Sequence, residues 1–263
     1  MSPRQWSTTF LQPQPTDPTT KFALIILNQP FSFPLLDRLW NSCEWRCCAD
    51  GGANRLYDSF ESLGLSPEEL EMMRKSYLPD LVKGDLDSVR DEVREYYSSL
   101  GVRVIHDHDQ YSTDLMKCIS AIQEKEKAEC TKEIPEQYTI ILLGGLSGRL
   151  DQTVHTLSLL HKLRKTRRFL FAVTDDNVGW VLDEGEHIIT IDHSILGPTC
   201  GLLPVGIDST ILSTKGLRWN LDEKESCFDG LVSTSNHLVP EEQVVWIKTT
   251  KPIWWVAELR TLS

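Results

Sequence analysis

Apolar and polar positions alternate in blocks over residues 21–176. Six short apolar runs fit buried strands, and they lie at 22–27, 45–49, 80–82, 102–105, 138–143 and 169–173. Between the later runs, apolar residues recur at helical spacing over 89–100 with Ser88 as N-cap, from Thr113 onward, and after Gly148. This alternation of strand and helix predicts a mostly parallel sheet that helices cover on both faces.

The helical spacing ends near residue 177. Strand-like runs then follow one another at 180–182, 187–191, 210–213, 231–233, 244–248 and 253–259, with Gly, Pro, Asn and Asp between them. Such a pattern is typical of a small sandwich or partial barrel. Residues 1–20 are polar and rich in Pro and Thr, which predicts a disordered tail. The predicted fold class is α/β, with a tail at 1–20, a parallel-sheet nucleotide-binding domain at 21–176 and an all-β sandwich domain at 177–263.

Composition narrows the class of partner. A chain of 263 residues with 40% hydrophobic residues can bury the cores of one or two domains. No run approaches the ~18 apolar residues of a membrane-spanning helix, so no membrane partner is expected. The net charge of −11 argues against nucleic acid, which needs clustered Lys and Arg, but it allows a phosphate ligand whose charge a metal ion offsets.

The seven cysteines predict neither a zinc site nor a disulfide framework. Cys43, Cys47 and Cys48 cluster without zinc-site spacing, and no matching second pair follows. Residues 1–20 lack the apolar stretch of a secretory signal. Both observations indicate reduced thiols in a cytoplasmic protein.

Ligands of parallel sheets bind where loops leave the carboxyl ends of the strands, so the residues after each predicted strand carry the chemistry. The run at 45–49 ends in Asp50, Gly51 and Gly52, ahead of a predicted helix. Adjacent glycines let the backbone approach a ligand closely, and a helix N-terminus favours an anion. A tight strand-to-helix turn explains the same residues without a ligand.

The loop at 83–88 carries two carboxylates. Asp85 and Asp87 are two residues apart in an extended segment, so they point the same way. Paired oxygen ligands of this kind suit Mg²⁺, which completes its shell with water and phosphate. The alternative is a solvated acidic loop that caps the following helix.

The loop at 106–114 also follows a strand and opens a helix. Asp109 and Thr113 are four residues apart, as are Gln110 and Asp114, so each pair shares a face if the helix starts early. Lys117 lies three residues after Asp114. The two histidines of this loop do not predict zinc, because no third nitrogen or sulfur ligand has suitable spacing.

The loop at 143–152 combines three glycines with an arginine and an acid. Backbone N–H groups around Gly145 and Gly148 can line an anion, and Arg149 can form a bidentate contact with it. The string is not a Walker loop, which needs Gly-Lys-Ser/Thr after four spacer residues, and it lacks the dinucleotide spacing. A standard P-loop ATPase and a standard dehydrogenase are therefore disfavoured.

These loops should gather at one edge of the sheet. The edge would then hold six aspartates, with three cations to balance them: Asp50, Asp85, Asp87, Asp109, Asp114 and Asp151 against Lys83, Lys117 and Arg149. So many carboxylates in one pocket repel one another unless a cation is bound. A complex of Mg²⁺ and ATP supplies that cation, and the sequence predicts a magnesium-dependent enzyme that uses ATP for phosphate chemistry.

Seven strings of the chain together resemble the eukaryotic thiamin pyrophosphokinase family. They are CADGGANRLYD (48–58), GDLDS (84–88), DQYSTD (109–114), LGGLSGRLDQ (143–152), CGLLPVG (200–206), GLRWNL (216–221) and LVSTSN (231–236). The resemblance covers about residues 21–259 and both predicted domains. It implies transfer of a diphosphate from ATP to the hydroxyl of thiamin, giving thiamin diphosphate and AMP, with Mg²⁺. It also implies a homodimer with shared active sites, in which one subunit holds ATP and the β-domain of the other helps to hold thiamin.

The resemblance also implies roles for residues. Metal binding falls to Asp85, Asp87 and Asp114, and catalytic roles to these three together with Arg149 and Asp151. Nucleotide contacts are expected from Asp50, Gly51, Gly52, Asp109, Gln110, Thr113, Lys117, Gly145, Gly148 and Gln152. Thiamin contacts are expected from Trp219, Asn220, Ser233, Thr234, Ser235 and Asn236. An indole such as Trp219 can stack on thiamin or face its cation, for ~0.5–2 kcal/mol, although a buried sandwich tryptophan is the alternative.

Two other functions stay open. A non-catalytic sensor of thiamin or nucleotide could keep the same fold, but simple binding does not need so many carboxylates. A pyrophosphokinase for another alcohol is the second alternative, and the segment 216–221 argues for thiamin instead.

Overall fold

The computed structural model describes residues 2–13, 20–131 and 136–262. Internal contacts divide the chain into two compact units, Asp17–Gly148 and the combination of Met1–Thr16 with Arg149–Ser263. The predicted boundary after residue 176 differs from this division. The reason is that α6 (Leu150–Leu163) and β7 (Leu170–Val173) both contact β8 (Asn177–Leu182), and β7 pairs with β8 in antiparallel fashion.

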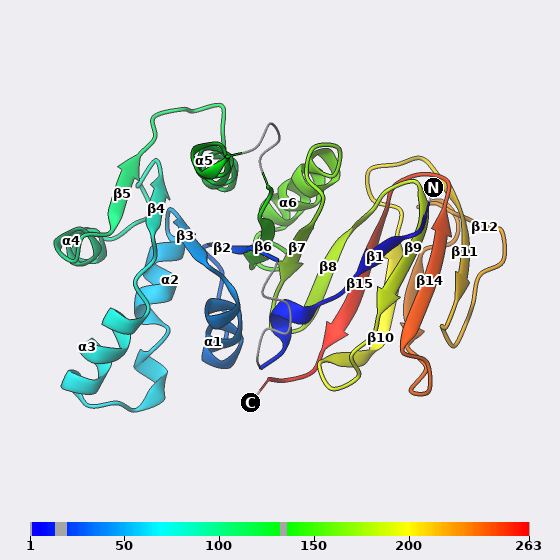
Figure 1. The fold of residues 1–263 in the computed structure, drawn as a ribbon, viewed down its shortest axis with the longest axis horizontal. Coiled ribbons are helices and arrows are strands. Elements are labelled where there is room, and N and C mark those ends of the chain that lie inside the picture. The colour runs from blue at the N-terminus through cyan, green and yellow to red at the C-terminus, as the bar shows by residue number, and fades with distance from the viewer. Residues whose placement is uncertain (1, 14–19, 132–135, 263) are drawn as a thin grey trace. The chain divides into compact units, whose positions relative to one another are not determined.

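The unit Asp17–Gly148 is built on a parallel sheet. Its strands are β2 (Phe22–Ile26), β3 (Trp45–Ala49), β4 (Leu81–Gly84), β5 (Arg103–His106) and β6 (Thr139–Leu143). Neighbours pair in parallel in the order β6–β2–β3–β4–β5 (Figure 1). The chain runs outward from β2 to β5 and then returns to the other side of β2. The carboxyl ends of β2 and β6 therefore form a topological switch point, where open α/β sheets bind ligands.

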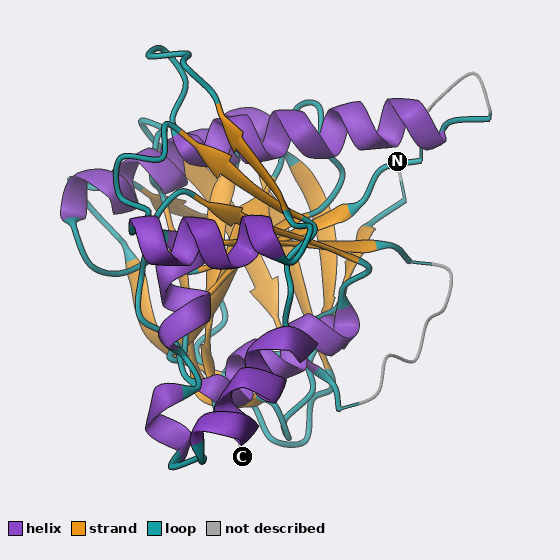
Figure 2. Cartoon of the chain, turned by 90° about the vertical axis from the view of Figure 1, so that its left-hand side faces the viewer, coloured by secondary structure: helices purple, strands orange, loops and turns teal. Residues whose placement is uncertain are grey.

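Helices lie on both sides of these strands, as Figure 2 shows above and below the sheet. They are α1 (Phe33–Ser42), α2 (Gly52–Asp58), α3 (Pro67–Ser76), α4 (Asp91–Ser99) and α5 (Asp114–Glu129). Successive side chains of a strand point to opposite faces. Accordingly, Cys47 Sγ of β3 points to the face that α5 covers and lies 3.2 Å from Cys118 Sγ of that helix. The sequence prediction of a two-sided parallel sheet is confirmed.

Two helix starts refine the prediction. Thr113 caps α5, and its side-chain oxygen accepts a hydrogen bond from the backbone N–H of Met116 at 3.4 Å. Ser88 does not cap α4, whose N-cap is Arg90. The Ser88 hydroxyl instead donates to the Asp87 carboxylate at 2.9 Å, so Ser88 bonds to a neighbouring side chain and not to a backbone N–H of α4.

The second unit contains two mostly antiparallel sheets. The first has the order β1 (Arg4–Trp6), β9 (Gly185–Thr190), β14 (Val244–Thr249), β11 (Thr210–Lys215) and β12 (Lys224–Ser226). The second has the order β13 (Ser233–His237), β10 (Leu196–Leu203), β15 (Ile253–Leu259), β8 and β7. Trp6 of the first sheet stacks on Trp180 of the second at 5.6 Å.

Three strands between residues 196 and 237 depart from the prediction. The strand expected at 231–233 lies at Ser233–His237 instead, and neither β10 nor β12 was expected. Gly197 and Pro198 gave β10 the composition of a loop, and its pairing with β15 shifts register between Leu196 and Cys200, where these two residues lie. β12 is only three residues long and mainly charged.

The predicted disordered tail is wrong for part of its length. Arg4–Trp6 pairs in parallel with β9, and a short 3-10 helix follows at Thr9–Leu11. Trp6, Phe10 and Leu11 are buried, and Trp6 Nε1 donates to His187 Nδ1 at 3.0 Å. Three large apolar side chains thus anchor a mostly polar segment, and residues 14–19 lie outside the described part of the chain. Within the described residues, no helix has both the length and the apolar character to cross a membrane.

Candidate functional site

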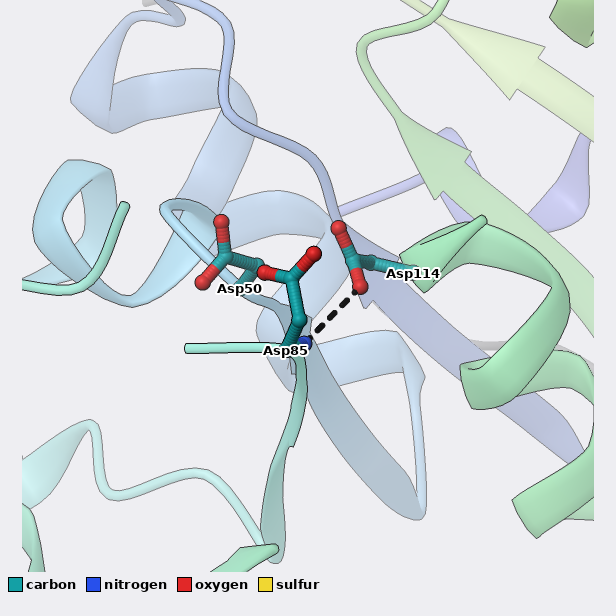
Figure 3. Close-up of side chains that lie close together, drawn as sticks. All are labelled: Asp50, Asp85 and Asp114. Carbon is teal, nitrogen blue, oxygen red and sulfur yellow. Dashed lines mark hydrogen bonds between the residues drawn. The ribbon is translucent and has the colours of Figure 1, made fainter. Parts of the chain in front are cut away.

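Three carboxylates meet at the carboxyl edge of the parallel sheet (Figure 3). Asp50 follows β3, Asp85 follows β4, and Asp114 is the first residue of α5. One oxygen of each lies within 4.8 Å of the others, and Asp114 Oδ1 accepts a hydrogen bond from the Asp85 backbone N–H at 3.2 Å. We call these three residues the carboxylate cluster. It brings together Asp85 and Asp114, two of the predicted metal ligands, with Asp50, which was expected at the nucleotide.

Backbone geometry at Gly84 and Asp50 allows this close approach. A Cβ on Gly84 would stand 2.7 Å from Asp50 Cβ and 3.0 Å from Asp114 Oδ1, so any side chain there would push the carboxylates apart. Asp50 has a φ of 44°, in the left-handed region that costs a non-glycine residue about 1–3 kcal/mol. Its backbone N–H donates to Lys83 at 3.0 Å, which holds the strained conformation in place. Strain of this kind clusters at functional sites.

Asp50 is the most buried member of the carboxylate cluster. Its side chain is 5% exposed, and among the described residues its Oδ1 has no hydrogen-bond partner. Burial raises the pKa of Asp50, and the charges of Asp114 and Asp85 add to the rise, against hydrogen bonds from Ser88 and Gly51 that lower it. A buried carboxylate oxygen without a donor is costly unless a cation satisfies it. The three oxygens therefore fit a hard divalent cation such as Mg²⁺.

Two buried lysines flank the carboxylate cluster. Lys117 Nζ lies 3.1 Å from Asp114 Oδ1, and Lys83 Nζ lies 3.2 Å from Asp107 Oδ2. Burial alone would lower the pKa of Lys117, but the hydrogen bond and charge of Asp114 outweigh it and raise that pKa. Lys117 is thus a cation that offsets one of three carboxylates. Lys83 pairs with Asp107, which was not among the predicted site residues.

Asp87 and Asp109 lie outside the carboxylate cluster. Asp87 is exposed and accepts the Ser88 hydroxyl at 2.9 Å, so its role at a metal stays a prediction. Asp109 accepts the Ser112 hydroxyl at 2.5 Å, and this hydrogen bond holds the pKa of Asp109 below its usual range. The helix does not start early enough for Asp109 and Thr113 to share a face, because α5 begins only at Asp114. Gln110 is exposed in the same loop.

The glycines at the start of α2 have a packing explanation. A Cβ on Gly52 would stand 2.2 Å from the carbonyl oxygen of Ile26, and one on Gly51 would stand 2.3 Å from Asn28 Nδ2. Gly52 is required by a backbone clash whether or not a phosphate binds there, and Gly51 is favoured unless the Asn28 side chain moves. The alternative of a tight turn therefore accounts for these two residues, and their nucleotide contact stays a prediction.

The second glycine loop (residues 144–148) follows β6. Gly144, Gly145 and Gly148 have φ values of 103°, 90° and 79°, which only glycine adopts readily. Gln29, from the loop after β2, reaches into it: its Oε1 accepts hydrogen bonds from the Gly145 N–H at 2.8 Å and the Ser147 hydroxyl at 3.0 Å. The sequence did not single out Gln29. Its place directly after the predicted strand at 22–27 was the available signal.

Arg149 and Asp151 pair with each other at the start of α6. Arg149 Nη2 lies 2.6 Å from Asp151 Oδ2, and Nε lies 3.1 Å from Oδ1, so the contact is bidentate. The hydrogen bond from Arg149 lowers the pKa of Asp151. Both side chains are exposed, as is Gln152 beside them. An anion that binds Arg149 must therefore compete with Asp151.

The predicted thiamin residues form one corner of the second unit. Asn236 accepts the Trp219 N–H at 3.2 Å and donates to the Trp219 carbonyl at 2.8 Å. Asn220 Oδ1 accepts from the Leu217 N–H at 3.1 Å and the Thr214 hydroxyl at 3.3 Å. Both asparagines therefore shape the loop that carries Trp219.

Trp219 is not a core residue. Its side chain is 52% exposed, with the Arg218 guanidinium 4.9 Å from the ring centre and the His237 ring at 5.1 Å. The alternative of a buried sandwich tryptophan is wrong for this residue. Of the three predicted thiamin residues that directly precede Asn236, Ser233 is buried, whereas Thr234 and Ser235 are exposed.

Known proteins match this chain along most of its length. The family model for the thiamin pyrophosphokinase catalytic domain matches residues 36–171, and the model for the thiamin pyrophosphokinase vitamin B1 binding domain matches residues 186–254. Thiamine pyrophosphokinase 3 of Oryza sativa subsp. japonica is 41% identical over 245 residues, which cover 91% of this chain and 87% of the rice protein. Thiamine pyrophosphokinase 1 of Arabidopsis thaliana is 39% identical over 260 residues, covering 97% and 93%.

Solved structures share the fold. The crystal structure of yeast thiamin pyrophosphokinase aligns with a TM-score of 0.82 at 27% identity, covering 98% of this chain and 92% of the yeast chain. Thiamin pyrophosphokinase from Candida albicans aligns with a TM-score of 0.81 at 26% identity, covering 98% and 93%. The mixed α/β architecture with large sheets is thus common to this chain and those enzymes.

Proposed function

The chain belongs to the thiamin pyrophosphokinase family, and on this premise we propose that it transfers a diphosphate group from ATP to the hydroxyl of thiamin. A bond forms between the thiamin oxygen and the β-phosphorus of ATP, and the bond from that phosphorus to the oxygen of the α-phosphate breaks. The hydroxyl proton leaves, and the products are thiamin diphosphate and AMP. The carboxylate cluster is the observation that carries the proposal, because transfer between phosphates depends mainly on positioning and charge stabilisation.

Mg²⁺ is the cation that we propose for the carboxylate cluster. Asp50, Asp85 and Asp114 would hold it, with Asp87 as a further ligand. When bound, the ion offsets the charge of the ATP phosphates. Lys117 keeps the Asp114 carboxylate in place through its 3.1 Å contact.

Asp87→Ala tests the assignment of the fourth carboxylate. Because Asp87 is exposed and makes only a local hydrogen bond, the variant should keep its fold and lose most of its turnover. Undiminished activity of a folded Asp87→Ala protein would remove Asp87 from the site.

Phosphate and nucleotide contacts are proposed for both glycine-containing loops and the loop before α5. Arg149 suits a phosphate because its guanidinium already forms a bidentate contact with a carboxylate, and phosphate oxygens offer the same geometry. In that case the phosphate would replace Asp151 as the partner of the Arg149 guanidinium when the substrate binds. The remaining proposed contacts are Gly51, Gly52, Asp109, Gln110, Thr113, Gly145, Gly148 and Gln152.

The thiamin side is proposed at Trp219. Its exposed indole can face the flat pyrimidine or the positively charged thiazolium, at about 0.5–2 kcal/mol for a cation over a ring. Asn220 and Asn236 support that indole through the loop, and Ser233, Thr234 and Ser235 complete the proposed surface.

Product analysis tests the function directly. Purified protein is supplied with ATP, Mg²⁺ and thiamin, and nucleotides and thiamin esters are separated by chromatography. We expect AMP and thiamin diphosphate in equal amounts. ADP as the product would contradict diphosphate transfer, and bound ATP that is never consumed would favour a sensor. Faster turnover with another alcohol in competition would favour the other alternative.

We also propose a homodimer in the cytoplasm. Leu150 and Val154 lie four residues apart on α6 and are 75% and 54% exposed, an apolar surface that a second copy would cover. Light scattering should give twice the mass of the chain, and Val154→Asp should shift it towards the monomer.

Five buried thiols suit a reducing compartment such as the cytoplasm: Cys43, Cys47, Cys48, Cys118 and Cys200.

A further inference from the structure

Gln29 lies at the switch point of the parallel sheet, in the loop that leaves β2 and against the loop that leaves β6. It is 9% exposed, and its side chain fits against both ends of the second glycine loop. A Cβ on Gly144 would stand 3.3 Å from Gln29 Oε1, and a Cβ on Gly148 would stand 3.7 Å from Gln29 Nε2. The contact is tight at Gly144, whereas a Cβ on Gly148 would only touch Gln29, and the φ values of 103° and 79° favour glycine at both positions.

The hydrogen bonds of Gln29 fix the direction of its amide group. The backbone N–H of Gly145 can only donate, so the amide atom that faces it at 2.8 Å must be the oxygen. The Ser147 hydroxyl, at 3.0 Å, approaches the same oxygen. Nε2 is therefore turned away from the Gly145 N–H, and within the described residues it makes no hydrogen bond. A primary amide nitrogen carries two N–H donors, so both remain for a ligand that lies against the loop.

We propose that Gln29 positions the polyphosphate of ATP. Its Oε1 holds the second glycine loop in shape, and its Nε2 donates a hydrogen bond to a phosphate oxygen that lies against that loop. This inference rests on the proposed function, and it adds a residue that the phosphate-binding motifs do not contain. The carboxylate cluster at the same edge of the sheet already repels the phosphates. A neutral side chain such as Gln29 can donate a hydrogen bond to them without adding to that repulsion.

Two substitutions separate the two roles. Gln29→Glu keeps oxygen acceptors for Gly145 and Ser147 but replaces the N–H donors with a negative charge. Gln29→Ala removes both the acceptor and the donor. The matched control is Glu126→Ala: Glu126 is also buried, and its Oε1 accepts the Tyr138 backbone N–H at 2.8 Å. Glu126 acts at the opposite end of β6, because Tyr138 lies six residues before Gly144, about 20 Å at ~3.3 Å per residue.

The experiment measures three quantities for each protein: the affinity for a non-hydrolysable ATP analogue with Mg²⁺ by calorimetry, kcat and KM for ATP with thiamin, and Tm. Gln29→Glu should keep a Tm close to wild type and lose about 10-fold or more in analogue affinity, with a matching rise in KM, since a hydrogen bond to a charged group is lost. Gln29→Ala should lose affinity and kcat together. Glu126→Ala should lower Tm and leave analogue affinity unchanged.

Two results would overturn the proposal. One is a Gln29→Glu protein that binds the analogue as tightly as wild type, and the other is a Gln29→Ala protein whose affinity falls no further than that of Glu126→Ala. If Gln29→Ala does not fold, the Gln29→Glu measurement still decides. A wild-type protein that makes no AMP would contradict the proposed function alone, because the binding measurement judges Gln29 independently of turnover.

Discussion

The backbone N–H of Asp85 donates to Asp114 Oδ1 at 3.2 Å, so the loop after β4 is tied to the first turn of α5. Lys117 Nζ approaches the same oxygen at 3.1 Å. One carboxylate oxygen thus joins two elements and a buried cation. The structural role of this oxygen can be separated from its negative charge, because the amide oxygen of an asparagine at position 114 would accept the same hydrogen bonds.

Asp114→Asn should therefore fold normally and lose most of its activity. The amide oxygen can still accept from Asp85 and Lys117, but the negative charge that a cation needs is gone. We expect kcat/KM to fall by about 100-fold or more, with a Tm near that of wild type. Steady-state kinetics over a range of Mg²⁺ concentrations makes the measurement. Asp91→Asn is the control, because the Asp91 side chain is 81% exposed and pairs with Arg94 on the surface of α4. Equal losses in both variants would contradict the assignment.

Gly84→Ala should disrupt the carboxylate cluster through one methyl group. The new Cβ would lie 2.7 Å from Asp50 Cβ and 3.0 Å from Asp114 Oδ1, so both side chains must move. Turnover should fall by about 10-fold or more, since displacements near 1 Å in a site cost that much or greater. Gly101→Ala is the control: it has nothing within 4 Å but a φ of +83°, and it should cost stability without changing kcat. A fully active Gly84→Ala enzyme would show that the cluster is not required.

Trp219→Ala should raise KM for thiamin and leave KM for ATP unchanged. Trp219 is 52% exposed and its backbone is held by Asn236, so removal of the ring should change recognition more than folding. An increase of about 3-fold to 30-fold is expected from the loss of a cation–ring contact. Phe228→Ala offers a control in the same unit, because Phe228 is 66% exposed and is not part of the proposed thiamin surface. If both variants keep the wild-type KM for thiamin, Trp219 does not bind it.

Protonation of His187 at low pH should lower the stability of the second unit. Burial lowers the pKa of His187 from 6.5 and the charge of Arg4 adds to this, against the hydrogen bond to the Asp183 carbonyl and the charge of Asp183, which raise the pKa. In the folded protein Nδ1 accepts the Trp6 indole N–H. A depressed folded pKa contributes stability that is present above the unfolded value of 6.5 and is lost as pH falls through the folded value. Tm of wild type should therefore fall with pH in that window. His187→Gln should show a flatter profile, whereas His193→Gln, which changes a half-buried residue on the same unit, should keep the wild-type slope.

Local signals were sufficient for the parallel sheet and for the loops at its carboxyl edge. Short apolar runs predict the strands, and the Asp, Gly or helix-cap residues that follow them mark where each strand ends. These signals depend on residues only a few positions apart. Thr113 is an example, since its side chain caps α5 through a backbone group three residues away. Asp85 and Asp114 could likewise be predicted as neighbours, because parallel strands bring successive loops to one edge.

Relationships over long distances in the sequence could not be predicted in this way. Gln29 meets Gly145 across 116 positions, and Trp6 meets His187 across 181. Nothing near Gln29 or Trp6 in the sequence specifies such a partner. The place of Asp50 in the carboxylate cluster depends on a positive φ at a non-glycine residue, which the tertiary contacts impose and composition does not reveal.

The parallel pairing of Arg4–Trp6 with 187–189 also has a consequence for how the molecule is made. A ribosome releases these first residues long before their partner strand exists, and at ~5–20 residues per second the delay is on the order of 10–40 s. During that time Trp6, Phe10 and Leu11 have no sheet to enter, whereas the strands of Asp17–Gly148 can already meet one another. The beginning of the chain is thus among the last parts to reach its final place, and a nascent protein carries it as an uncovered apolar segment that chaperones can bind.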